Sequence, residues 1–226
     1  LLSLATSIML ARMLGPEGRG LLLALTFWPT LLTGVLSLSL NEGANYHIAQ
    51  FSSGLRVDAV NSTAFWLVLT VTTVGALIIL PLLWLVVPEQ YRVNFELICA
   101  FALAFMLLGN LMSLYRAVIQ GQGQLARLNL MRLVQPLSYF VLLAGVFAWG
   151  SGLGVRVVMG VMLAAMAIST LVGIAITWFP IHLFRRRVAK GIMATSWRFH
   201  KANLVLYASA EIDKAIVLLF LPTAQV

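Results

Sequence analysis

The sequence predicts an all-α fold, a polytopic bundle of membrane-spanning helices. Two observations support this prediction. Hydrophobic residues make up 61% of the 226 residues and charged residues only 10%, whereas about a quarter of the residues in a soluble domain are charged. Apolar segments of roughly 18 or more residues also recur along the chain, and each is long enough to cross a hydrocarbon core of about 30 Å.

Turns rich in glycine, proline and charged residues separate seven expected helical segments. In chain order these segments are 1–14, 21–50, 59–87, 93–120, 127–149, 156–182 and 202–221. Pro88 stops the third segment, and Gly121 and Gly123 interrupt the helical pattern between the fourth and fifth, where glycine allows a tight reversal. Because the chain begins at Leu1, already inside an apolar stretch and without an initiating Met, we expect a fragment with an incomplete first helix.

The distribution of Lys and Arg predicts the orientation in the membrane. The net charge of +8 would suggest a nucleic-acid partner in a soluble protein, but here the basic residues gather in alternate loops, so no nucleic-acid partner is expected. Ten lie in or beside the loops near 51–58, 121–126 and 184–201, against four in the other loops. Because basic loops stay on the cytoplasmic side, the N-terminus is expected in the cytoplasm.

Residues 184–201 are expected to form a basic cytoplasmic connector between two lobes. This stretch carries six cations and no acid, and each cation near an anionic leaflet contributes about 1 kcal/mol of attraction. Residues 1–183 would then be a first transmembrane lobe of six helices, and residues 202–226 the first helix of a second lobe. The first and seventh segments end in loosely similar sequences, which suggests parallel repeats, a known transporter design with the site between the halves.

Four stretches resemble the Wzx-like oligosaccharide flippases of the multidrug/oligosaccharidyl-lipid/polysaccharide exporter superfamily. They are LARMLGPEGRGLLLAL, SLNEGANYHIA, YRAVIQGQGQLARLNLMRLVQPLSY and AEIDKAIVLLFLPTAQV. The resemblance runs along the whole chain, although Arg19 stands where the family often has an aromatic or aliphatic residue. It implies a MATE-like protein of the cytoplasmic (inner) membrane that flips an undecaprenyl-diphosphate-linked oligosaccharide for cell-surface polysaccharide synthesis. The implied partners are this lipid-linked oligosaccharide, membrane lipids and, as a further expectation, other polysaccharide-assembly proteins.

Ionisable side chains inside the predicted spans are candidate substrate-binding residues, since each costs about 2.5–3.5 kcal/mol to insert at bilayer depth. Glu42 and Asn45 lie near the end of the second segment, where they either line a cavity or emerge into water. Glu211, Asp213 and Lys214 lie in the seventh segment. Glu211 and Lys214 are three residues apart and could form an internal salt bridge, but three charges in one span favour a role in binding substrate or a coupling ion. The resembled family tends to carry an acid at the position of Asp213.

Arg116 and Arg132 are the candidates for holding a diphosphate, with Lys214 contributing from the seventh segment. Arginine offers planar, bidentate donors that match phosphate, and both residues lie a turn or more inside their helices. The alternative is snorkelling, in which the long stem lets the charge reach the interface. Arg127, on the turn itself, is explained by orientation alone.

No sequence motif indicates an enzyme, a cofactor or a metal site, because nucleotide-binding glycine loops, nucleophile elbows and metal-ligand spacings are missing from the sequence. Two alternatives to a flippase remain. A drug/cation antiporter of the same superfamily would need acids in the core of the first lobe, where Glu42 and Glu96 are the candidates. A membrane glycosyltransferase or polysaccharide ligase would need a large extracytoplasmic loop, and the predicted outer loops are short.

Overall fold

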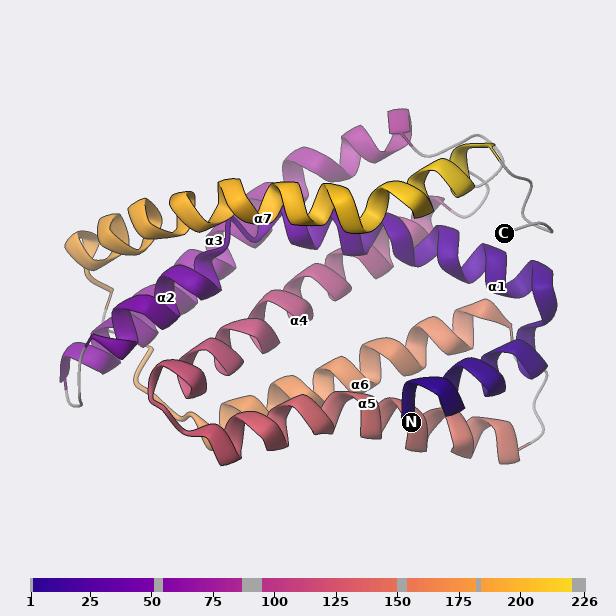
Figure 1. Ribbon diagram of the computed structural model, residues 1–226, viewed down its shortest axis with the longest axis horizontal. Coiled ribbons are helices and arrows are strands. Elements are labelled where there is room, and N and C mark those ends of the chain that lie inside the picture. Colours follow the sequence, from indigo (N-terminus) through magenta and orange to yellow (C-terminus); the bar gives the residue numbers. More distant parts are fainter. Residues whose placement is uncertain (1, 51–54, 87–94, 150–153, 182–183, 221–226) are drawn as a thin grey trace.

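The computed structural model describes residues 2–50, 55–86, 95–149, 154–181 and 184–220. These residues form seven helices and no strand, which confirms the all-α prediction (Figure 1). The helices are α1 (Leu2–Leu36), α2 (Leu40–Ala49), α3 (Leu55–Val86), α4 (Phe95–Gly121), α5 (Leu125–Ala148), α6 (Val155–Ile176) and α7 (Arg186–Phe220). Five of them, α1 and α3 to α6, are long and apolar enough to cross a membrane, so this is a multi-pass membrane protein.

Helix α1 contains the first predicted turn as a sharp reversal. Gly15 lies at this point with φ 64° and ψ −176°, outside the helical region. Glycine adopts positive φ without steric cost, and Pro16 then suits the first position of the following helical arm. The chain reverses direction between the two arms of α1 (Figure 1). The first arm corresponds to the first predicted segment, and the second arm to the part of the second predicted segment that ends at Leu36.

The prediction of one continuous helix over residues 21–50 is wrong. The chain breaks after α1, where Leu38 and Ser39 adopt left-handed conformations with φ 46° and 52°, and α2 starts at Leu40. Such conformations are uncommon for residues other than glycine, so the surroundings must hold them. Ser39 donates its N–H to the Ser37 hydroxyl at 3.3 Å and accepts a 2.9 Å hydrogen bond at its own hydroxyl from Asn203 of α7.

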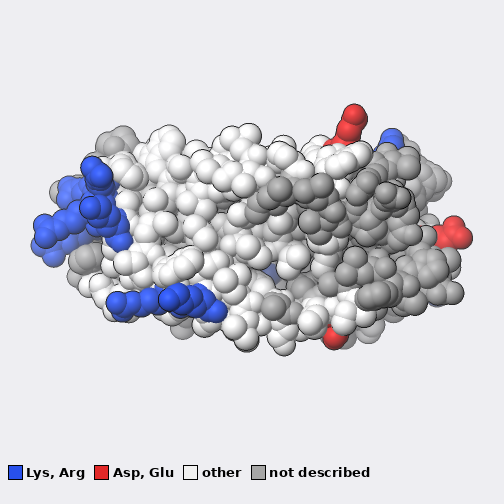
Figure 2. All heavy atoms as spheres, turned by 90° about the horizontal axis from the view of Figure 1, so that it is seen from above, with Lys and Arg blue, Asp and Glu red and all other residues white. Residues whose placement is uncertain are grey.

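The loops predicted to lie on one side of the membrane meet at one end of the bundle. The α4–α5 hairpin, the start of α3 and the start of α7 lie at this end, and the reversal of α1 lies at the opposite end (Figure 1). In the hairpin, α4 ends at Gly121 and Gly123 has φ 70°, as the glycine pattern predicts. Seen from above, Lys and Arg gather at the end where α7 begins, while most of the visible acids lie toward the other end (Figure 2).

The seventh helix begins earlier than predicted, because the basic stretch is helical. Instead of a connector over 184–201 followed by a helix over 202–221, one helix runs from Arg186 to Phe220. Its buried side chains recur every three or four residues, while its cations are exposed: the buried ones are Ala189, Ile192, Ser196 and His200. This amphipathic pattern is typical of a helix packed against a protein core. The proposed boundary between two lobes stays a prediction.

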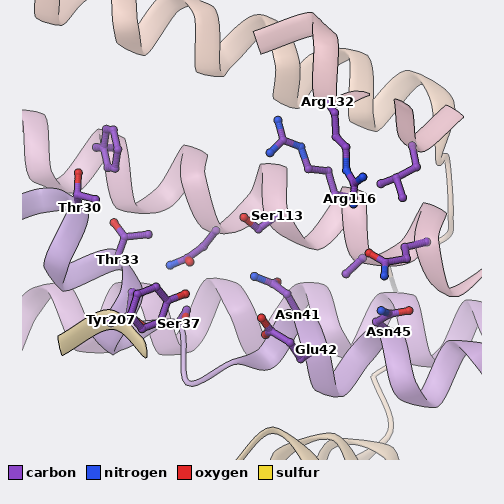
Figure 3. A pocket seen from close by; sticks show the side chains of 16 residues that line it. Thr30, Thr33, Ser37, Asn41, Glu42, Asn45, Ser113, Arg116, Arg132 and Tyr207 are labelled. Carbon is purple, nitrogen blue, oxygen red and sulfur yellow. Dashed lines mark hydrogen bonds between the residues drawn. The ribbon is translucent and has the colours of Figure 1, made fainter. Parts of the chain in front are cut away.

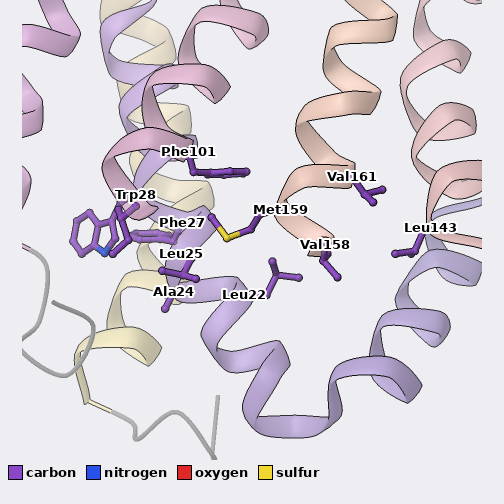
Figure 4. Close-up of a cluster of buried hydrophobic side chains, with 11 residues drawn as sticks. Leu22, Ala24, Leu25, Phe27, Trp28, Phe101, Leu143, Val158, Met159 and Val161 are labelled. Carbon is purple, nitrogen blue, oxygen red and sulfur yellow. The ribbon is translucent and has the colours of Figure 1, made fainter. Parts of the chain in front are cut away.

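Three apolar clusters hold the helices together, and the smallest joins α4 to α5 around Tyr115 and Met131. The first joins the second arm of α1 to α4, α5 and α6 and includes Leu25, Trp28, Phe101 and Met159 (Figure 4). The second joins α2, α3, α4 and α7, at residues that include Leu40, Ile48, Val60, Leu114 and Ile192. Glycines allow neighbouring helices to approach one another closely, as small residues commonly do where helices pack in membranes. A Cβ at Gly173 of α6, for example, would lie 2.9 Å from the Tyr115 Cβ of α4.

The Asn203 contacts predict a measurable stability effect. We expect Asn203→Leu to destabilise the protein by about 1–3 kcal/mol, because the substitution removes the amide that donates to the Ser39 hydroxyl. This part-buried hydroxyl then lacks that hydrogen bond. Thermal unfolding of the purified protein would measure this change. Asn129→Leu, the same substitution on the exposed face of α5, is the control. Equal melting temperatures for the two variants would show that the hydrogen bond from Asn203 to Ser39 does not stabilise the non-helical stretch between α1 and α2.

Candidate functional site

A polar cavity of about 440 Å³ lies between α1, α2, α4, α5 and α7. One wall is formed by α1 and α2, and their polar side chains at this wall are Thr30, Thr33, Ser37, Asn41, Glu42 and Asn45 (Figure 3). The facing wall is formed by α4, which contributes Asn110, Ser113, Arg116 and Gln120. Amide and hydroxyl groups therefore dominate the polar lining of a cavity in the membrane-spanning part of the protein.

These polar side chains share faces of their helices, which explains how they come together. Positions 30 and 33 in α1, positions 41 and 45 in α2, and positions 110, 113, 116 and 120 in α4 recur at intervals of three or four. Residues at these intervals lie on one side of an α-helix. Glu42, Asn45 and Arg116 were predicted from the sequence as charged or amide groups, but the hydroxyl groups of α1 and the neutral polar groups of α4 beside them were missed. The spacing was the signal that could have found these groups.

Arg116 projects from α4 toward α5 and is half-buried. Its Nη2 donates to the main-chain carbonyl of Met131 at 3.3 Å and to Oε1 of Gln135 at 3.2 Å. Its Nε is buried and has no hydrogen-bond partner among the described residues. Buried polar groups are nearly always paired, so the unpaired Nε is an exception that the described contacts of Arg116 do not satisfy.

Arg132 reaches the same cavity from α5, and its side chain is exposed. Two cations from two helices thus line one cavity, and Glu42 is the one acid among the described lining residues. Figure 3 shows the two arginines near one another on the α4–α5 side, across the cavity from Glu42. The α4–α5 side is therefore positively charged and suits an anionic group.

The opposite side of the cavity is tied to α7. Asn203 donates to Oε1 of Glu42 at 3.4 Å as well as to the hydroxyl of Ser39. Tyr207, one turn further along α7, lines the cavity and packs on Gly34, where an added Cβ would lie 3.2 Å from its ring. Helix α7 thus lines the cavity through Tyr207 and contacts the lining residue Glu42 through Asn203. Neither α7 residue was among the predicted site residues.

The predicted site residues fall into two groups. Arg116, Arg132, Glu42 and Asn45 come together at the polar cavity, although their binding role stays a prediction. Asp213 and Lys214 lie further along α7 with exposed side chains and do not line this cavity. Glu211 lies in α7, but its side chain is outside the described residues, and the predicted pair with Lys214 stays a prediction.

A second cavity, also of about 440 Å³, adjoins the first at the arginines. Both cavities are lined by Phe105, Arg116 and Arg132. Beyond these shared residues, however, the second cavity lies against the first arm of α1, α5 and α6, and its lining is mostly apolar. Besides the polar Thr6 and Gln135, its other lining residues are Leu2, Pro136, Tyr139, Met162, Ala165 and Met166.

In the part of the chain that the structure describes, no group of three or more His, Cys, Asp or Glu side chains is placed to hold a metal ion. The polar and charged groups of the cavity can instead hold a ligand through hydrogen bonds and ionic contacts.

The helical fold and the polar cavity among its spans are those of a multi-pass membrane transporter. Comparison with known families agrees: the family model described as "Polysaccharide biosynthesis protein" matches residues 1–226. The chain therefore belongs to this family, which comprises Wzx-like polysaccharide flippases and related exporters. Members of the family are generally transporters rather than enzymes. No curated protein and no solved structure matches the chain.

Proposed function

We propose that this protein flips an undecaprenyl-diphosphate-linked oligosaccharide across the cytoplasmic membrane for cell-surface polysaccharide synthesis. The observation that carries the proposal is the pair Arg116 and Arg132, which line a polar cavity from two different helices. A guanidinium binds phosphate oxygens through parallel hydrogen bonds, and a diphosphate buried away from water needs several such donors.

The remaining lining suits the glycan. Sugar hydroxyls both donate and accept hydrogen bonds, and so do the amide and hydroxyl side chains along α1, α2 and α4. Such groups tolerate different sugars, whereas the arginines read the diphosphate that lipid-linked glycans share. The proposal therefore assigns head-group recognition to Arg116 and Arg132, with Asn45 and Glu42 among the groups that face the glycan.

Loss of either arginine tests this proposal. We expect Arg116→Ala and Arg132→Ala to lower glycan export at least about tenfold, because each removes a charge-assisted contact worth about 1.5–3 kcal/mol. Export is measured in a flippase-deleted strain that carries the full-length protein at matched abundance. Arg127→Ala is the matched control, since Arg127 is exposed on the hairpin and donates to Gln124 at 2.8 Å. Parental export by both cavity variants would refute the proposed role of the arginines.

A drug/cation antiporter is the second candidate, because Glu42 lines the cavity. A cationic substrate would, however, meet two arginines there, and like charges repel. The two functions predict opposite patterns. In an antiporter, Glu42→Gln abolishes efflux of a cationic drug while Arg116→Ala leaves it intact. In the flippase proposed here, glycan export depends on Arg116 more strongly than on Glu42.

We further propose that the hairpin end of the bundle faces the cytoplasm, which also places the N-terminus inside. The excess of Lys and Arg at this end supports this orientation. In a Cys99→Ala background, a cysteine introduced by Gln122→Cys on the exposed hairpin should resist a membrane-impermeant thiol reagent in intact cells and react after permeabilisation. Labelling in intact cells would reverse the orientation.

A further inference from the structure

The two cavities that meet at the arginines differ in chemistry. The first has amide, hydroxyl and charged groups along α1, α2 and α4, beside a few apolar side chains such as Phe105 and Leu128. The second is lined largely by aromatic and aliphatic side chains of α5 and α6, including Tyr139 and Met162. Because Arg116 and Arg132 line both, the cations stand at the boundary between a polar and an apolar compartment.

A lipid-linked glycan consists of a polar glycan, a diphosphate and an apolar polyprenyl chain, in this order. The polar cavity, the two arginines and the apolar cavity follow the same order. A ligand with its diphosphate at the arginines would extend one part into each cavity. Apolar surface gains free energy when it leaves water, while sugar hydroxyls lose free energy when they are buried without partners. The chemistry of the two cavities therefore favours a ligand with its glycan in the polar cavity and its polyprenyl chain in the apolar cavity. It disfavours the reverse orientation.

We propose that the apolar cavity between α1, α5 and α6 receives the diphosphate-proximal part of the polyprenyl chain. This inference rests on the proposed function and adds to it a lipid subsite within this bundle. Tyr139 lies seven residues after Arg132 in α5, which is about 10 Å along a helix, so the cavity extends from the cations along the spans. A volume of about 440 Å³ suits a small ligand and admits the first isoprenoid units of a long chain.

Pro136 fits this arrangement. It lies in α5 between Arg132 and Tyr139, lines the apolar cavity, and has no N–H to donate to the carbonyl four residues before it. The apolar ring of Pro136 therefore belongs to the cavity lining one helical turn after Arg132. Gln135, next to it, accepts the hydrogen bond from Arg116, which fixes the guanidinium at the boundary.

A series of prenyl diphosphates tests the inference directly. The probes are inorganic pyrophosphate and isopentenyl, geranyl and farnesyl diphosphates, titrated into the purified full-length protein in lipid nanodiscs, with empty nanodiscs as the blank. We expect farnesyl diphosphate to bind at least about tenfold more tightly than pyrophosphate, because each buried methylene adds affinity. We expect the gain per isoprenoid unit to level off once the cavity is filled.

Two neighbouring alanines of α6 provide a matched pair of variants. Ala165 is buried and lines the apolar cavity, whereas Ala164 is exposed. Ala165→Leu should abolish the gain with chain length and keep pyrophosphate affinity within about twofold of parental. Ala164→Leu should preserve both. Met162→Phe, at a half-buried lining position, is the second cavity-filling variant if Ala165→Leu does not fold.

The outcomes separate this inference from the proposed function. If pyrophosphate binds and Arg116→Ala weakens it, but chain length brings no gain or the gain survives Ala165→Leu, the lipid subsite is refuted and the diphosphate site stands. If pyrophosphate does not bind, or binds equally to Arg116→Ala, the proposed function fails together with the inference. The chain-length series on the parental protein decides the matter even if both cavity-filling variants misfold.

Discussion

Gly43→Leu is expected to lower the fraction of the protein that folds. Gly43 lies in α2 directly against α7, where an added Cβ would collide with the Ser196 hydroxyl and approach the Ile192 carbonyl oxygen to 2.9 Å. The serine side chain can turn away, but the main-chain carbonyl moves only with α7. Overpacking a well-packed core costs about 1–3 kcal/mol, and a leucine here must also separate two helices that border the cavity. Fluorescence-detected size-exclusion chromatography measures the folded fraction.

Gly160→Leu is the matched control for this substitution. Gly160 also lies inside a helix, α6, but an added Cβ there has no neighbour within 4 Å among the described atoms. The intrinsic helix preference of leucine over glycine is therefore the same in both variants, and only the contact differs. If Gly43→Leu yields as much folded protein as Gly160→Leu, the close approach of α2 and α7 does not exist in the membrane.

Charge reversal at Arg116 is expected to abolish transport. Arg116→Glu would place a carboxylate against two acceptors that the guanidinium now satisfies, the Met131 carbonyl and Gln135 Oε1, and it would repel a diphosphate. Each hydrogen bond from a charged group contributes about 1.5–3 kcal/mol, and this variant loses two of them in addition to the contact with the ligand. Since about 1.4 kcal/mol is a factor of ten, export should fall at least about a hundredfold, below the level of Arg116→Ala.

Arg127→Glu makes the same charge reversal outside the cavity. Arg127 is exposed and contacts Gln124 within the hairpin, so export should stay within a few-fold of parental. Both variants remove one cation from the same basic end, which equalises any effect on membrane orientation. Equal loss of export in both would indicate an orientation defect and would contradict a specific role for Arg116.

The long apolar spans from α3 to α6 and the turns beside them were predicted well from the sequence, because both follow from local rules. Gly121 and Gly123 mark the hairpin, Gly15 marks the reversal of α1, and long apolar runs define the spans. The break at Leu38 and Ser39 could not be predicted this way. Its left-handed residues are neither glycine nor asparagine, and a tertiary contact from Asn203, 164 residues away from Ser39, holds them.

The prediction that helix α7 starts at residue 202 is wrong for a different reason. Its basic first half resembled a loop because cations dominate its composition, whereas the buried positions 189, 192, 196 and 200 follow a helical period. The same lesson applies to the cavity. Charged residues drew attention to Arg116, Arg132 and Glu42, but the neutral polar stripes around them are visible only as a spacing. Lys214 was selected by its charge, and its exposed position in α7 follows from tertiary packing.

Translocation by purified protein tests the central claim, that the cavity carries a diphosphate-linked glycan across the membrane. The full-length protein is reconstituted into vesicles that contain a lipid-linked oligosaccharide, and an added membrane-impermeant glycan-cleaving enzyme reports the glycan that reaches the outer leaflet. We predict transfer of the inner-leaflet pool by the parental protein and by Arg127→Ala, and its loss in Arg116→Ala. Transfer no faster than in protein-free vesicles, or equal transfer by Arg116→Ala, would contradict the claim.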